Sequence, residues 1–166
     1  MIKQRKVGEL KHEVSKDTVA ILVDGQNVDA CKYSRDILNL AMGLGELSFS
    51  WFYHHWDRMK LYEMKRMKDD GWETINVLEA GKNALDYQAM NEIKQRCNIQ
   101  GMPDILILVT CDKDFLPLVK DFLRAKRRVI IVGRRNAISH RLLSWVHHDF
   151  YWVEELSRCP LSFEAF

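Results

Sequence analysis

The sequence predicts an α/β domain built as a doubly wound, three-layer sandwich around a mostly parallel sheet of five or six strands. Two nearly continuous apolar runs, residues 18–23 and 105–110, have the pattern of strands buried on both faces, as in a parallel sheet covered by helices. Apolar strand-like runs alternate with amphipathic helical segments, which favours right-handed βαβ units. Aspartates also stand where the apolar segments end. Together these observations predict one sheet with a polar site at its carboxyl edge.

Hydrophobic spacing and turn residues place each element along the chain. The expected strands are residues 18–23, 48–54, 74–78, 104–110, 128–132 and 150–153. The expected helices cover residues 28–42, 57–71, 82–97, 115–122 and 137–147. Asn27 is expected to cap the first helix, and Gly43 and Gly45 to end it. The predicted domain therefore spans residues 18–156, between an N-terminal extension (1–17) and a C-terminal tail (157–166).

Composition places the chain among folded globular proteins. Its 166 residues, 47% hydrophobic and 29% charged, suffice for one buried core. No segment approaches the roughly 18 apolar residues of a membrane span, and the first residues lack the apolar core of a signal peptide. We therefore expect a cytoplasmic protein with no membrane partner. The four cysteines show no zinc-binding spacing and are expected to be reduced thiols.

Four aspartates stand where an apolar segment gives way to a turn or a helix. Asp24 ends the first apolar run, while Asp112 and Asp114 follow the second. Asp86 begins the apolar stripe of a predicted helix, at 4, 3, 4 spacing. Because ligands of parallel sheets bind beyond the carboxyl ends of the strands, we expect these acids to converge. Converging carboxylates repel one another unless a cation neutralises them, and Mg²⁺ and Mn²⁺ prefer oxygen ligands.

Three segments resemble the signature blocks of the NYN domain family. They are Val-Asp-Gly-Gln-Asn at residues 23–27, Lys-Asn-Ala-Leu-Asp at 82–86 and Thr-Cys-Asp-Lys-Asp-Phe-Leu-Pro-Leu-Val at 110–119. The resemblance covers about residues 18–153 and points to the LabA/limkain-like branch of the PIN-like nuclease superfamily. It implies a parallel sheet of order 3-2-1-4-5, in which the first and fourth strands are neighbours. Asp24 and Asp112 would then face each other.

The resemblance implies a divalent-metal-dependent ribonuclease that hydrolyses RNA phosphodiester bonds. Asp24, Asp86 and Asp112 would hold Mg²⁺ or Mn²⁺, and Asp114 would be a further ligand or would orient the attacking water. Such an ion can activate water, neutralise phosphate oxygens and stabilise the leaving oxygen. Asn27 is the fifth expected catalytic residue, because its amide can donate to a carboxylate or to the phosphate.

Contacts with RNA are expected from polar and basic residues near the strand ends. Lys82 would neutralise phosphate charge, and Thr110 would bond a ligand oxygen. Cations also gather around the late strand, and three of these complete the predicted RNA contacts: Arg128, Arg134 and Arg135. The RNA is expected to be single-stranded, because a recessed metal site needs an accessible phosphate. The oligomeric state stays open, a homodimer included.

Two departures from the family pattern keep a second function class open. Cys111 stands where the family often has glycine, and Glu92 is the nearest counterpart of a further helix acid. The alternative to catalysis is a non-catalytic RNA-binding or scaffold module on the same fold. A dinucleotide-binding domain would need a Gly-x-Gly-x-x-Gly run where only Gly25 stands. A haloacid dehalogenase-type phosphatase would need an acid at Gln26.

Overall fold

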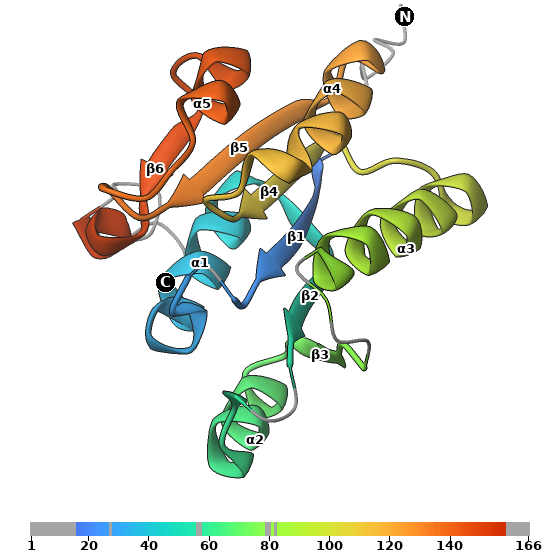
Figure 1. Ribbon diagram of the computed structural model, residues 1–166. Coiled ribbons are helices and arrows are strands. Elements are labelled where there is room, and N and C mark those ends of the chain that lie inside the picture. The colour runs from blue at the N-terminus through green and yellow to red at the C-terminus, as the bar shows by residue number, and fades with distance from the viewer. Residues whose placement is uncertain (1–15, 27, 56–57, 79–80, 82, 159–166) are drawn as a thin grey trace, which may run out of the picture.

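The computed structural model describes residues 16–26, 28–55, 58–78, 81 and 83–158, and forms one sheet of six parallel strands in the order β3-β2-β1-β4-β5-β6 (Figure 1). The strands are β1 (Thr18–Asp24), β2 (Glu46–His54), β3 (Glu73–Asn76), β4 (Ile105–Val109), β5 (Arg128–Gly133) and β6 (Phe150–Trp152). The helices are α1 (Ala30–Leu44), α2 (Leu61–Asp69), α3 (Ala84–Gln100), α4 (Leu116–Arg124) and α5 (His140–Val146). Two 3₁₀ segments are η2 (Lys113–Phe115) and η3 (Val153–Arg158).

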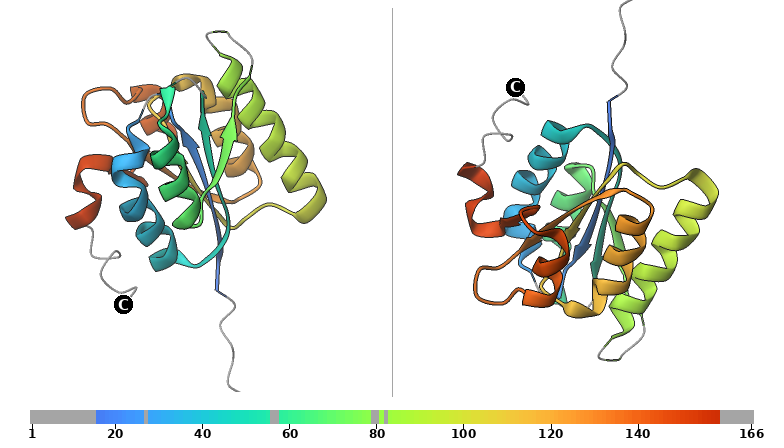
Figure 2. Two further views of the ribbon diagram at one scale, coloured as in Figure 1. Left: turned by 90° about the horizontal axis from the view of Figure 1, so that it is seen from below. Right: turned by 90° about the horizontal axis from the view of Figure 1, so that it is seen from above.

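The helices cover both faces of the sheet, which confirms the predicted three-layer sandwich. One face carries α1, α2 and η3, and the other carries α3, α4 and α5 (Figure 2). The chain reaches the sheet edge at β3 and returns through α3 to β4, which pairs with β1. The strand order therefore reverses between β1 and β4, and a doubly wound sheet binds its ligands beyond the strand ends at such a point.

The middle of the sheet is buried on both faces, as the apolar runs predict. Residues 19–23 of β1 and 106–109 of β4 have no exposed surface. On α4, the side chains of Leu118, Val119 and Phe122 pack against this core. Both strands that lead into the predicted site are therefore fixed by packing along their whole length.

Helix α1 ends two residues later than expected. Gly43 lies inside the helix, and Gly45 follows its last residue. The Gly45 N–H donates to the Ala41 carbonyl at 3.2 Å, and a Cβ at Gly45 would lie 2.1 Å from the Asp17 carbonyl oxygen. Close approach of two backbones thus requires glycine at position 45. The expected cap, Asn27, lies outside the described residues.

Helix α2 begins at Leu61 instead of at Asp57, which lies outside the described residues. The Lys60 N–H donates to the Glu63 carboxylate at 3.0 Å, so the glutamate caps the helix that it belongs to. The sequence signal at Asp57 was therefore the wrong start. The other strand and helix ends differ from the predicted ones by a few residues.

Two expectations from composition can be compared with the described part of the chain. None of its helices is both long and apolar enough to cross a membrane. Cys31, Cys97 and Cys111 are free thiols, and Cys159 lies outside the described residues.

Candidate metal centre

Asp24 ends β1 and is held there by two hydrogen bonds. Its side chain is fully buried, with one oxygen accepting from the Gln26 N–H at 3.1 Å and the other from the Thr110 hydroxyl at 2.9 Å. The chain then turns at Gly25, whose N–H donates to the Tyr53 carbonyl at 2.9 Å. A Cβ at Gly25 would lie 2.4 Å from that carbonyl oxygen, so only glycine permits the turn.

Thr110 connects the ends of β1 and β4. Its hydroxyl donates to Asp24 and also accepts from the Asp112 N–H at 3.1 Å, and the residue has no exposed surface. The sequence placed Thr110 among the RNA contacts, and both hydrogen bonds that its hydroxyl makes here are internal. Thr110 therefore positions the two aspartates.

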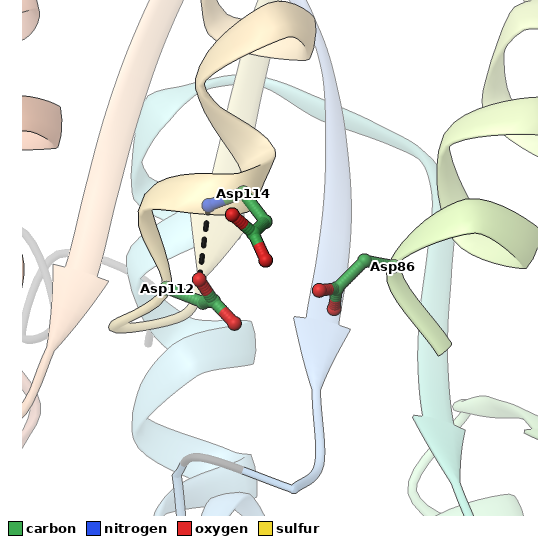
Figure 3. A group of neighbouring side chains, drawn as sticks. All are labelled: Asp86, Asp112 and Asp114. Carbon is green, nitrogen blue, oxygen red and sulfur yellow. Dashed lines mark hydrogen bonds between the residues drawn. The ribbon is translucent and has the colours of Figure 1, made fainter. Parts of the chain in front are cut away.

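Asp112 and Asp114 lie in the tight connection from β4 to α4. One oxygen of Asp112 accepts from the Asp114 N–H at 2.9 Å. This hydrogen bond caps the amino end of η2. The fully buried Phe115 anchors this 3₁₀ turn in the core. Figure 3 shows both carboxylates on the side of the turn that faces α3. The turn thus presents two acids to one space.

Asp86 approaches the same space from the first turn of α3. It is only 3% exposed and shares the buried side of the helix with Leu85, Ala89 and Ile93. Within the predicted stripe, Ile93 is buried as expected, while Met90 is only partly covered. Burial disfavours an ionised carboxylate at this position. The first turn of a helix favours an anion and so partly offsets that cost.

The three carboxylates form a compact cluster. Asp86, Asp112 and Asp114 each offer an oxygen, and these atoms lie within 4.8 Å of one another (Figure 3). The pKa of Asp86 is raised from 3.8 to about 7, first by burial and then by the charges of Asp24, Asp112 and Asp114 in that order. Asp24 lies outside the set of three, yet its charge has the largest charge effect on Asp86.

The cluster suits a hard divalent cation. All three donors are carboxylate oxygens, the ligands that Mg²⁺ and Mn²⁺ prefer over softer metals. Ligands on opposite sides of one Mg²⁺ lie about 4.2 Å apart, so small side-chain rotations would bring the three oxygens around one ion. Burial and three neighbouring carboxylates raise the pKa of Asp86, and a cation bound between these acids would oppose that shift.

The predicted basic contacts lie at different ends of β5. Arg134 and Arg135 follow its carboxyl end, where Arg135 pairs with Glu155 and lies over the Trp152 ring at 5.3 Å. Arg134 is exposed, and its N–H donates to the Cys111 thiol at 3.3 Å. This bond gives Cys111 a structural role where the family often has glycine.

Arg128 begins β5, at the amino edge of the sheet. It makes two hydrogen bonds to the Asp149 carboxylate, at 2.8 and 3.0 Å. The five residues to the carboxyl end of the strand span roughly 16 Å. The structure therefore does not bring Arg128 to the acid cluster. Two other predicted residues, Asn27 and Lys82, lie outside the described part of the chain.

Sequence reasoning missed two residues near the cluster, Lys113 and Tyr53, and also the bond that Tyr53 makes to Glu92. Lys113 stands exposed between Asp112 and Asp114, and its place in the third block was the available signal. The buried Tyr53 hydroxyl donates to the Glu92 carboxylate at 2.6 Å, and burial together with this bond raises the pKa of Tyr53 far above its usual range. The bond ties β2 to α3, which carries Asp86. No sequence spacing indicates that pairing.

Comparisons with known proteins agree with this fold. A family model described as the NYN domain matches residues 18–154. Among solved structures, a protein of unknown function from Vibrio parahaemolyticus superposes with a TM-score of 0.71 at 20% identity, covering 86% of this chain and 96% of that chain. At that identity the likeness shows the fold alone. Comparison with curated proteins gave no sequence match. The finer assignment to the LabA/limkain-like branch stays a prediction.

Proposed function

The chain belongs to the NYN domain family of PIN-like nucleases, and on that premise we propose that it is a divalent-metal-dependent ribonuclease that hydrolyses RNA phosphodiester bonds. A shared fold does not specify an activity, so the proposal depends on the site. The observation that carries it is the convergence of Asp86, Asp112 and Asp114 within 4.8 Å at the point where the strand order reverses.

Each acid of the site has a distinct part in the proposal. Asp86, Asp112 and Asp114 would hold Mg²⁺ or Mn²⁺, which when bound activates water, neutralises phosphate oxygens and stabilises the leaving oxygen. Asp24 adds negative charge beside the cluster and so favours a cation there. Thr110 keeps Asp24 and the Asp112 turn in register through its two hydrogen bonds. Asn27 is proposed to orient a carboxylate or the phosphate.

Exposed cations would bring the RNA to these acids. Lys113 projects from the turn that carries Asp112 and Asp114, and Arg134 follows the carboxyl end of β5. Phosphate contacts with such residues supply affinity without reading the base sequence. Asp86 is recessed, so we propose a single-stranded substrate, whose phosphate can enter the site more easily than that of a duplex.

Cleavage of a labelled RNA panel tests the proposal. Single-stranded, hairpin and duplex RNAs are incubated with Mn²⁺, with Mg²⁺ or with EDTA. The matched control is Asp112→Asn, because the remaining amide oxygen can still accept from the Asp114 N–H and keep the turn. We expect cleavage by the wild type with metal and none by the variant. Salt-sensitive RNA binding without cleavage under Mn²⁺ would instead support the non-catalytic RNA-binding module.

A further inference from the structure

A cavity lined by both polar and apolar side chains opens near the carboxyl edge of the sheet, away from the acid cluster. It lies between α2 and β3, has a volume of about 370 Å³, and its polar lining includes His54, Lys65, Lys68, Thr74 and Asn76. Neither the acid cluster nor its proposed chemistry uses any of these side chains. The cavity therefore needs its own explanation.

Two buried polar atoms in this cavity have no hydrogen-bond partner in the described part of the chain. They are Nδ1 of His54, a residue that is only 5% exposed, and the amide oxygen of Asn76. The two residues are direct partners in the β2–β3 ladder, so their side chains lie side by side on one face. Buried polar atoms are nearly always paired, and a small rotation of the Asn76 side chain toward the cavity would let a ligand group donate to its amide oxygen.

Positive charge borders the same cavity. Lys65 and Lys68 lie one turn apart on α2, are exposed, and make no ion pair with any described residue. Burial lowers the pKa of His54, and the Lys68 charge lowers it further, although the His55 backbone opposes the shift. Asp69 also lines the cavity, so its net charge is positive. An anionic group is favoured here.

The cavity and the acid cluster share one edge of the sheet. His54 and Asn76 are the last residues of β2 and β3, just as Asp24 is the last residue of β1. β3 is two strands from β1, a distance of about 10 Å. The cavity lies on the face that carries α2 and the acid cluster on the face that carries α3, so a strand of RNA at the cluster would reach the cavity by crossing the carboxyl ends of the strands.

We infer that the cavity between α2 and β3 binds a nucleotide of the RNA strand at a distance from the cleaved bond. Its phosphate pairs with Lys65 and Lys68, and a ribose hydroxyl or base amino group donates to the Asn76 amide oxygen beside His54. Free phosphate would satisfy the lysines through its oxygens, but only a nucleotide adds a ribose and a base that occupy the rest of a cavity of about 370 Å³, so the chemistry favours a nucleotide. This inference rests on the proposed ribonuclease function and names a substrate contact for it.

The first test measures binding without cleavage. In an Asp112→Asn background with EDTA, fluorescence anisotropy compares Lys65→Ala/Lys68→Ala with Lys94→Ala/Lys120→Ala, which removes the same charge from α3 and α4 on the other face. We expect the first pair to weaken binding of labelled single-stranded RNA roughly tenfold, as two charged contacts would. The salt slope of log K should flatten by about 1.4. Equal losses in both pairs overturn the inference.

The second test reads the cavity directly. The NMR signals of the His54 ring are followed while uridine 5′-monophosphate or inorganic phosphate is added, with Asn76→Ala as the comparison. We expect the nucleotide to move them more than phosphate does, and Asn76→Ala to reduce the effect. Unmoved signals overturn the inference. Metal-dependent cleavage by the wild type is scored separately, so the cavity can fail while the nuclease proposal stands; loss of both cleavage and RNA binding overturns both.

Discussion

Thr110 and Asp24, 86 residues apart in the sequence, join the ends of β4 and β1 through a buried hydrogen bond of 2.9 Å from the hydroxyl to the carboxylate. The same hydroxyl accepts from the Asp112 N–H at 3.1 Å. One side chain thus fixes the relative position of two acids that belong to different strands. The spacing of the site depends on a group that makes no contact with substrate or metal in the proposed function.

Thr110→Val should therefore damage both stability and activity. Valine has nearly the same shape but can neither donate to Asp24 nor accept from the Asp112 N–H, and losing these buried hydrogen bonds should cost about 1–3 kcal/mol in unfolding free energy. Urea denaturation measures this loss, and cleavage under Mn²⁺ should fall with it. Thr110→Ser keeps the hydroxyl and is the control. Equal stability of the valine variant and the wild type would contradict the assigned role.

Millimolar Mn²⁺ should raise the melting temperature, because an ion that binds only the folded protein stabilises it by mass action. At a hundred times the dissociation constant the gain is about 3 kcal/mol, or roughly 5–10 °C for a chain of this size. EDTA should reverse the rise, and Asp112→Asn should lose most of it. Differential scanning fluorimetry measures the shift. A wild-type curve that Mn²⁺ leaves unmoved would argue against the metal centre.

Stability should depend on pH through Asp86. Its pKa is about 7 in the folded protein and 3.8 in its ordinary state, so the folded protein binds more protons between these values. The contribution of Asp86 to stability therefore falls as pH rises from about 4 to 7, and its full cost is present above 7. Without metal, Asp86→Asn should be more stable than the wild type at pH 8 by a few kcal/mol of unfolding free energy. This magnitude follows because each tenfold change in proton affinity corresponds to ~1.4 kcal/mol. The gap should close near pH 4. Urea denaturation in EDTA across this range checks it, and a gap independent of pH would contradict it.

Metal affinity should rise with pH through the same range. A cation needs the ionised Asp86 carboxylate, so binding below pH 7 must release a proton. Calorimetric titration with Mn²⁺ in buffers of different ionisation enthalpy measures that proton. We expect release at pH 6 and little at pH 8.5. Identical heats in all buffers at pH 6 would show that Asp86 is already ionised or is not a ligand.

Tyr53→Phe should test the attachment of α3 to the sheet. The change removes the 2.6 Å bond to Glu92, and hydrogen bonds to charged groups are worth about 1.5–3 kcal/mol. Glu92 keeps its bond from Gln88, at 2.9 Å. Urea denaturation should show a loss in this range, and weaker Mn²⁺ binding should accompany it because α3 carries Asp86. Tight Mn²⁺ binding despite lowered stability would mean that α3 is placed by its apolar contacts alone.

Much of the fold could be predicted because it depends on local pattern. The continuous apolar runs of β1 and β4 predict strands that are buried on both faces. Because the two strands are parallel, their carboxyl ends bring Asp24 and Asp112 to one edge of the sheet. Side-chain pairing between distant residues follows no spacing rule. The bond from Thr110 to Asp24 and that from Tyr53 to Glu92 therefore appear only in three dimensions.

The predicted arginine contacts lie at different edges of the sheet, and the sequence already contained that information. Arg128 begins the predicted strand and Arg134 follows it, so the two must lie at opposite edges of the sheet. Charge clustering along the chain hid this difference. Arg128 pairs with Asp149, and Arg135 pairs with Glu155. Both acids belong to later segments of the chain, and no sequence pattern predicted these ion pairs.

Binding and cleavage should separate by mutation, because the exposed Arg134 and the acid cluster lie in different places. Arg134→Ala should weaken RNA binding and flatten its salt slope by about 0.7, the value for one phosphate contact with a single strand. Arg135→Ala should have a smaller effect, since that guanidinium is already paired with Glu155. Both variants should cleave at saturating RNA.

Asp112→Asn should instead lose cleavage and bind RNA as tightly as the wild type or more so, because it removes a negative charge beside the phosphate. It is a cleaner choice than Asp24→Asn, in which an amide group would replace one of two buried acceptors. Anisotropy across salt concentrations and single-turnover cleavage measure the two properties. Loss of cleavage in Arg134→Ala at saturating RNA would instead place Arg134 among the groups that act on the reacting phosphate.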